Sequence, residues 1–85
     1  MDRVELETRL REIIVSFMAV DEAKVTNSAN LVDDLGLDSL DRLELLMKIE
    51  DSFSIHLPDE AAKQIVDFGS LVDCVAAALG PRVVP

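Results

Sequence analysis

Apolar residues near the start of the chain recur at steps of three and four, which is the spacing of one face of a helix. The residues that set this pattern are Leu6, Leu10, Ile13, Ile14 and Phe17. Asp2 precedes them, and Glu5 lies three residues after Asp2, an arrangement that favours a helix start. We therefore predict a first helix over about residues 3–18, with its apolar stripe against a core.

A second helix is predicted to begin at Ser39. Asp38 is its expected N-cap, and Asp41 lies in the first turn, where a carboxylate suits the positive end of the helix dipole. The apolar side chains that should share about half of its circumference are Leu40, Leu43, Leu46, Met47, Ile49 and Phe53. The opposite stripe is mostly acidic and contains Asp41, Glu44, Lys48 and Asp51.

Two further helices complete the predicted fold. Pro58 and the acidic residues after it predict a short helix near 59–65. Asp67 is expected to cap a last helix that ends at Gly80, with apolar residues Phe68, Leu71, Val72, Val75 and Leu79. No segment alternates with period two, so we predict an all-α bundle of three main helices and one short helix. We expect the domain to span residues 1–80, with a disordered tail at 81–85.

The segment between the first two helices is rich in turn-forming residues, which predicts a long loop over 21–38. Apolar residues recur within it and should anchor it to the core. They are Val25, Leu31, Val32, Leu35 and Leu37. We therefore expect an ordered loop.

Composition narrows the class of protein. The 85 residues suit one small domain, and 49% hydrophobic residues are too many for a disordered chain. No run of about 20 apolar residues suggests a membrane span. A single cysteine, Cys74, excludes an intramolecular disulfide, and one cysteine with one histidine cannot supply the usual zinc ligands. The first residues do not resemble a signal peptide, so a cytoplasmic location is expected.

The charge of −9 is unevenly distributed. Residues 31–60 contain nine acidic and two basic side chains, a net charge of −7. This concentration repels nucleic acid and anionic membranes and favours docking to a basic protein surface. The alternative is a solvated acidic face that binds no partner.

The chain lacks the sequence motifs of most enzymes. It has no glycine-rich phosphate loop and no Gly-x-Ser-x-Gly turn, and His56 is its single imidazole. The acidic residues around Asp38 do not have the spacing of a twelve-residue calcium loop. We therefore expect neither catalysis nor a metal site.

Residues 33–44, which read DDLGLDSLDRLE, resemble the modification motif of acyl carrier proteins. In that family an Asp-Ser-Leu triplet after a leucine-glycine turn presents the serine that receives a phosphopantetheine arm. Phe53 and the stretch Leu57-Pro58-Asp59-Glu60 also fall where the family has similar residues. The resemblance extends from the first helix to Leu79.

The resemblance implies a non-catalytic carrier that holds acyl groups as thioesters on phosphopantetheine at Ser39. Its implied partners are a phosphopantetheinyl transferase, ketosynthases, acyltransferases and related fatty-acid or polyketide enzymes with basic docking patches. The carrier itself is expected to be a monomer. The residues expected to form its docking face are Asp38, Leu40, Asp41, Glu44, Met47 and Asp51.

In this family the acyl chain folds into a cleft among the helices. The matching positions here are Leu45, Leu46, Ile49, Phe53, Leu57, Ala62, Ile65 and Leu71. The ordinary interpretation of most of these residues is that they belong to the hydrophobic core. Only Ala62, with its small side chain, suggests space for an acyl chain.

Three residues depart from the family pattern. Arg42 and Lys48 add positive charge to the acidic helix, which either narrows the set of partners or forms helical ion pairs with Glu44 or Asp51. His56 is interpreted as an exposed loop residue without function. The competing functions are an acidic helical adaptor that binds a basic protein without a prosthetic group and, more remotely, a serine hydrolase.

Overall fold

The computed structural model describes residues 1–83, which contain four α-helices, two 3₁₀ turns and no β-strand. The α-helices are α1 (Arg3–Met18), α2 (Ser39–Phe53), α3 (Asp59–Ala62) and α4 (Phe68–Leu79). The 3₁₀ turns are η1 (Glu22–Lys24) and η2 (Gly80–Arg82). The predicted all-α architecture of three main helices and one short helix is confirmed.

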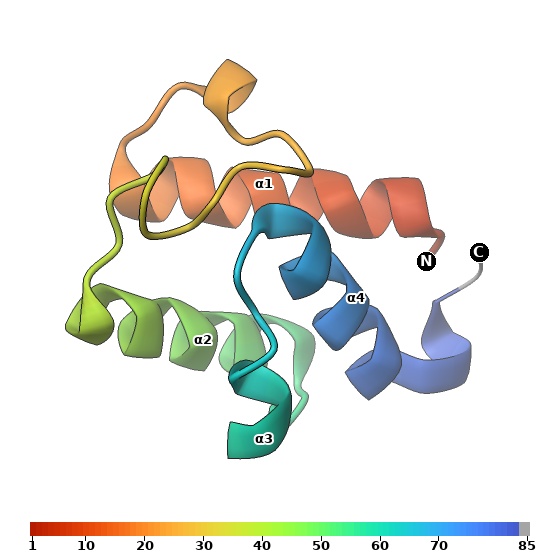
Figure 1. The fold of residues 1–85 in the computed structure, drawn as a ribbon. Helices are drawn as coiled ribbons and strands as arrows, with labels where there is room; N and C mark the ends of the chain where they lie inside the picture. The colour runs from red at the N-terminus through yellow and green to blue at the C-terminus, as the bar shows by residue number, and fades with distance from the viewer. Residues whose placement is uncertain (84–85) are drawn as a thin grey trace.

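Helices α1 and α2 run in opposite directions, and both α2 and α4 contact α1 (Figure 1). The long loop lies across α1 and leads into the first turn of α2, at the side of the molecule away from the two termini (Figure 1). The first and last turns of the described chain lie close together, since the Met1 amino group donates to the Arg82 carbonyl at 3.3 Å. The start of α2 lies far from both Met1 and Arg82 (Figure 1).

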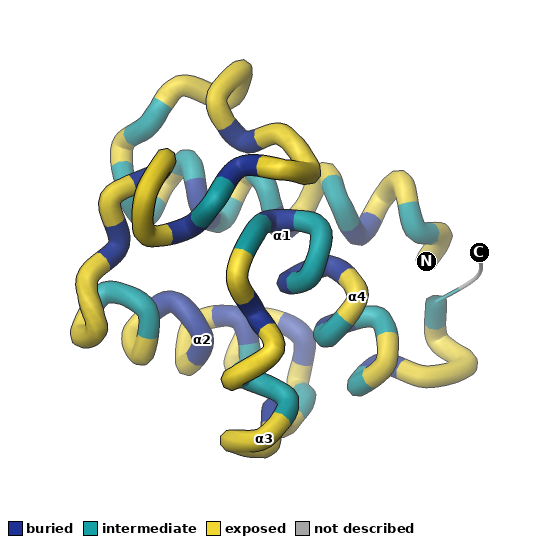
Figure 2. The backbone as a smooth tube through the Cα atoms, in the orientation of Figure 1, coloured by how far each residue is buried: buried dark blue, intermediate teal, exposed yellow. Residues whose placement is uncertain are grey.

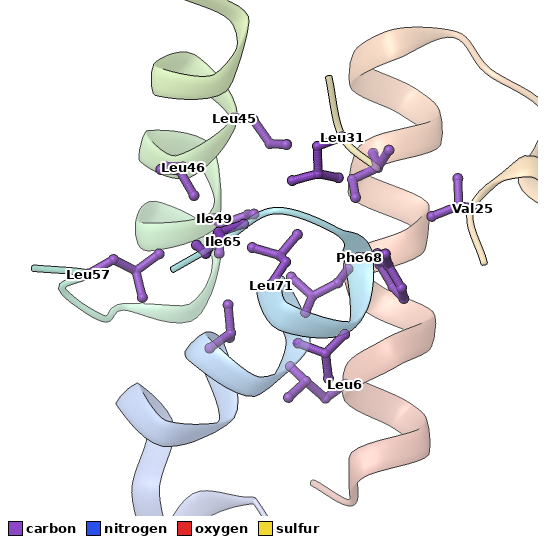
Figure 3. Packing of buried hydrophobic residues seen from close by; sticks show 14 of the residues in the cluster. Leu6, Val25, Leu31, Leu45, Leu46, Ile49, Leu57, Ile65, Phe68 and Leu71 are labelled. Atoms are coloured by element: carbon purple, nitrogen blue, oxygen red, sulfur yellow. The ribbon is translucent and has the colours of Figure 1, made fainter. Parts of the chain in front are cut away.

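The core is entirely apolar among the described residues, and Figure 2 shows its members on the inward sides of the helices and the loop. Phe68 is completely buried and packs beneath α1, where the Arg11 guanidinium carbon lies 5.0 Å from its ring centroid. Figure 3 shows Ile49, Ile65 and Leu71 close together between α2 and α4, and Leu45 extending from α2 toward Leu31. Residues from α1, the long loop, α2, the turns on either side of α3, and α4 thus share one core.

Helix α1 has the bounds that the sequence predicts. The Asp2 carboxylate accepts a hydrogen bond from the Glu5 N–H at 2.7 Å, which satisfies one of the free donors of the first turn. Leu6, Leu10 and Ile14 are buried, and Ile13 and Phe17 are partly buried against the same core.

The long loop is ordered by the anchors that the sequence predicts, with one exception. Val25, Leu31, Leu35 and Leu37 are buried, but Val32 is 52% exposed. The prediction for Val32 was wrong because the Asn30 side-chain oxygen accepts hydrogen bonds from the N–H groups of residues 32 and 33. The resulting turn places the Val32 side chain outside the core.

Backbone hydrogen bonds join this loop to the start of α4. The Leu31 N–H donates to the Val66 carbonyl at 3.1 Å, and the Phe68 N–H donates to the Ala29 carbonyl at 3.0 Å. At Gly69 a Cβ atom would lie 3.0 Å from the Asn27 carbonyl oxygen, so glycine permits this close approach.

Helix α3 is shorter than the predicted helix at 59–65. It ends at Ala62, and the chain continues through tighter bonds from the Gln64 N–H to the Ala61 carbonyl and from the Ile65 N–H to the Ala62 carbonyl. The Arg42 guanidinium also donates to the Ala62 carbonyl. The end of α3 is thus fixed partly by a side chain from α2, which local sequence signals do not indicate.

Helix α4 begins and ends as predicted. Asp67 and Ser70 form a capping box, and the hydrogen bonds from the Ser70 backbone and side chain lower the pKa of the Asp67 carboxyl. Gly80 has φ of 59°, which ends the helix. Of the tail predicted at 81–85, residues 81 and 82 belong to η2, and residues 84–85 lie outside the described residues.

None of the helices in residues 1–83 is both long and apolar enough to cross a bilayer.

Candidate functional site at the start of helix α2

Ser39 is the first residue of α2 and is exposed to solvent. The N–H groups of a first helical turn have no acceptor within their own helix, and they lie at the positive end of the helix dipole. Within residues 1–83, the Ser39 hydroxyl makes no hydrogen bond. The hydroxyl is therefore both accessible and uncommitted.

Asp38, rather than Ser39, caps the helix, as the sequence predicts. Its carboxylate accepts from the Asp41 N–H at 2.8 Å, and the Asp41 carboxylate accepts from the Asp38 N–H at 3.4 Å. This reciprocal pair is a capping box, which satisfies two backbone donors at the start of the helix. Ser39 is thus held next to a fixed residue while its own side chain is free.

The turn before Ser39 is anchored on both sides of Gly36. Leu35 and Leu37 are buried, and the Leu37 N–H donates to the Leu31 carbonyl at 3.0 Å. Gly36 has φ of 80°, a left-handed conformation that side-chain-bearing residues rarely adopt. The two buried leucines and this turn fix the path of the chain into Ser39.

The outer face of α2 is more apolar than predicted. Leu40, Leu43 and Met47 are 70%, 56% and 55% exposed, whereas Leu45 and Ile49 are buried. Leu40 and Met47 are thus exposed, as the predicted docking face requires, and Leu46, Ile49 and Phe53 from the same apolar set are buried. Leu43 is an exposed apolar residue that the predicted docking face omits.

A helical projection contains the signal that identifies Leu43. At about 100° per residue, the side chains of residues 40, 43 and 47 fall within about 60° of one another, and Glu44 and Asp51 fall beside them. An apolar group bordered by acidic residues on its own side of a helix is typical of a surface, because core positions seldom include charged side chains.

Asp38, Glu44 and Asp51 are exposed, and Asp41 is partly exposed. Among the described residues, none of these four carboxylates forms an ion pair. The structure thus brings the predicted docking residues together on the start and outer face of α2, with Asp41 also committed to the capping box.

The helical ion pairs considered for Arg42 and Lys48 are not among the ion pairs of residues 1–83. Arg42 instead donates to the Ala62 carbonyl. His56 is exposed as expected, but its Nδ1 lies 3.2 Å from the Glu50 Oε2 atom, which also accepts from the Leu57 N–H at 2.8 Å. His56 therefore lies within the turn that joins α2 to α3, beside the Glu50 carboxylate that holds this turn.

The predicted acyl-cleft residues meet in the core. Seven of the eight are buried, and Ala62 is partly buried. An open hollow of about 670 Å³ lies elsewhere, between the turn before α3, α3 and α4, and Leu57 is the one cleft residue among those that line it. In this structure the cleft residues belong to the core, and the hollow lies between α3 and α4 instead.

No group of three or more histidine, cysteine or acidic residues in the described part of the chain is arranged to hold a metal ion. Cys74 is partly buried, and this burial raises the pKa of its thiol, which keeps it in the less reactive protonated form.

The chain matches the model of one protein family, described as a phosphopantetheine attachment site, over residues 8–75. The match covers Ser39, the turn before it, all of α2 and α3, and most of α1 and α4.

Proposed function

Because the chain belongs to the phosphopantetheine attachment site family, whose domain carries a covalently attached phosphopantetheine, we propose that Ser39 is the attachment residue. The observation that carries this proposal is the exposed and uncommitted Ser39 hydroxyl at the start of a capped helix. The protein is then a carrier, on which the arm supplies a thiol that holds an acyl group as a thioester.

The residues around Ser39 suit a phosphodiester. The first turn of α2 presents backbone N–H groups and the positive end of the helix dipole to an anion attached there. The Asp38 carboxylate is held by the Asp41 N–H at 2.8 Å, so the neighbouring negative charge is fixed in the cap. The anchored Gly36 turn presents Ser39 at the surface.

We infer that attachment uses a separate transferase, because no base within residues 1–83 is hydrogen-bonded to the Ser39 hydroxyl. The described residues show no hydrogen bond between the Ser39 hydroxyl and a histidine or carboxylate. In the transfer from coenzyme A, the Ser39 oxygen loses its proton and bonds to phosphorus, while the pyrophosphate bond breaks and the nucleotide bisphosphate leaves. The transferase supplies the base for this step.

The outer face of α2 supports docking to enzymes of fatty-acid or polyketide synthesis. Exposed Leu40, Leu43 and Met47 provide apolar contact, and Glu44 and Asp51 beside them provide charge that can pair with lysine and arginine. A carrier must bind several partners briefly, and electrostatic steering onto a small contact area meets that need. Ketosynthases and acyltransferases with basic patches fit this surface.

Loading of the purified apo-protein tests the attachment residue. Incubation with coenzyme A and a phosphopantetheinyl transferase should increase the intact mass by one phosphopantetheine. The Ser39→Ala variant should gain nothing. The Ser52→Ala variant is a matched control, because Ser52 is also exposed on α2, and it should gain one arm as the wild type does.

An unchanged mass for the wild type would contradict the proposal and favour the acidic adaptor without a prosthetic group. Loading of the Ser39→Ala variant would place the arm on another residue.

A further inference from the structure

We propose that the inner half of the arm on Ser39 docks in a hollow beside it, with Arg42 and Lys63 attracting the phosphate. We call it the Arg42–Lys63 hollow. The residues that line it are Asn30, Leu31, Val32, Asp33, Arg42, Lys63, Ile65 and Val66. This inference rests on the proposed function, because it requires the arm to be attached at Ser39.

The hollow lies within reach of Ser39. Arg42 follows Ser39 by three residues in α2, so the two side chains lie on the same side of the helix, about 4.5 Å apart along its axis. The opposite wall comes from the segment after α3, and residues 30–33 of the long loop close one side. The larger hollow beside His56 is lined by the turn before α3, by α3 and by α4, and no residue of α2 lines it.

The charge of the hollow is opposite to that of its surroundings. Arg42 and Lys63 give two positive charges and Asp33 one negative charge, a net charge of +1. Residues 31–60 as a whole have a net charge of −7. A phosphodiester on Ser39 has one negative charge, and this hollow is the adjoining surface that attracts it.

Arg42 is positioned to bind an anion. Its guanidinium donates to the Ala62 carbonyl at the end of α3, which holds the side chain across the gap between α2 and α3. A guanidinium has five N–H donors, so donors remain for a second acceptor. Neither Arg42 nor Lys63 forms an ion pair within residues 1–83.

The other lining residues match the part of the arm that follows the phosphate, which is a carbon bearing two methyl groups and then an amide. Val32 and Val66 are exposed apolar side chains, and Ile65 is buried beneath. The Asn30 side-chain oxygen already accepts from two backbone N–H groups, so its amide nitrogen is left to donate. The volume of about 210 Å³ equals roughly seven water molecules of about 30 Å³ each, which is room for the inner part of the arm only.

Backbone amide NMR spectra of matched apo- and holo-proteins test this contact. In the wild type, loading should shift the resonances of residues 30–33 and 63–66 as well as those around Ser39. In the Arg42→Gln and Lys63→Gln variants, the shifts at 63–66 should shrink strongly, and the phosphorus-31 resonance of the arm should move away from its wild-type position. Lys48→Gln is the charge-matched control, because Lys48 lies on α2 but borders a different hollow against α1, and its spectra should change as the wild type's do.

Two features of the experiment keep its failures distinct. Each variant is compared with its own apo form, and Lys63→Gln does not disturb the Arg42 contact with Ala62 that holds α3. Shifts confined to residues 38–42 in the wild type, or shifts at 63–66 that survive both substitutions, would overturn the docked arm while leaving attachment at Ser39 intact. Failure of the wild type to gain an arm by mass would instead overturn the proposed function.

Discussion

Asp38 and Ser39 are adjacent residues with different tasks at the start of α2. Asp38 accepts the hydrogen bond that starts the helix, and Ser39 is left exposed with a free hydroxyl. This division was predictable from the sequence because N-capping depends on the identity of a few consecutive residues. The hydrogen bond of the Arg42 guanidinium was not predictable in this way, since its acceptor, the Ala62 carbonyl, lies 20 residues further along the chain.

The cap and the charge of Asp38 can be separated by substitution. Asp38→Asn keeps a good capping group, so its free energy of unfolding should stay within roughly 0.5 kcal/mol of the wild type. Asp38→Ala loses the bond to the Asp41 N–H and should be less stable by about 1 kcal/mol. Urea unfolding measures the free energy of unfolding of both variants.

Asp33→Ala is the control, because it removes an exposed acid whose side chain makes no hydrogen bond among the described residues. Its free energy of unfolding should be close to that of the Asp38→Asn variant. Equal losses for Asn and Ala at position 38 would show that charge, not capping, is important there.

At the scale of elements, helix α2 presents two apolar faces. One contains Leu45, Ile49 and Phe53 and packs in the core, and the other contains Leu40, Leu43 and Met47 and is exposed. The sequence predicted the start of this helix correctly and placed Leu40 and Met47 on the docking face. It did not assign Leu43 to that face, because hydrophobicity alone does not distinguish a core contact from a surface kept for a partner. The short α3 was also hard to predict, since a side chain from α2 helps to fix its end.

The charge beside the exposed face should control association. Glu44→Lys should slow loading by the transferase at low salt, and the loss should shrink as salt rises, because exposed charges are screened beyond about 10 Å at 0.1 M. Glu44 is the suitable acid for this substitution, because a change at Asp41 would also disturb the capping box.

The control is Glu12→Lys, an equal change in charge at an exposed position on α1. The measurement is kcat/KM for loading at several salt concentrations. Equal rates for the two variants at low salt would mean that the acidic residues of α2 are only solvated.

At the scale of the molecule, the sequence predicted the bundle well because each main helix has its own cap and apolar period. It did not predict the open hollows, which depend on how α3 rests against α2 and α4. The other global feature is charge, with −7 of the total −9 in residues 31–60. In a domain of this size the core is small and the net free energy of unfolding is low. The like-charge repulsion, which lowers this free energy, is therefore large in comparison with it.

This repulsion predicts stabilisation by salt. The melting temperature of the apo-protein should rise between low salt and about 0.5 M sodium chloride, and millimolar magnesium should also raise it. Asp33→Asn should reduce the salt response more than Glu12→Gln does, because position 33 lies inside the charged segment. Thermal unfolding followed by circular dichroism provides the melting temperatures. A melting temperature indifferent to salt and magnesium would show that the acidic residues are too far apart to repel one another.

The central claim is that Ser39 carries the arm, and fragmentation mass spectrometry of the loaded wild-type protein tests it most directly. The loaded protein is digested, and the peptide that contains residues 38–42 is sequenced by fragmentation. We predict one phosphopantetheine on Ser39, and none on the other exposed serines, at positions 16, 28, 52 and 54. An arm located on any residue other than Ser39 would contradict the account.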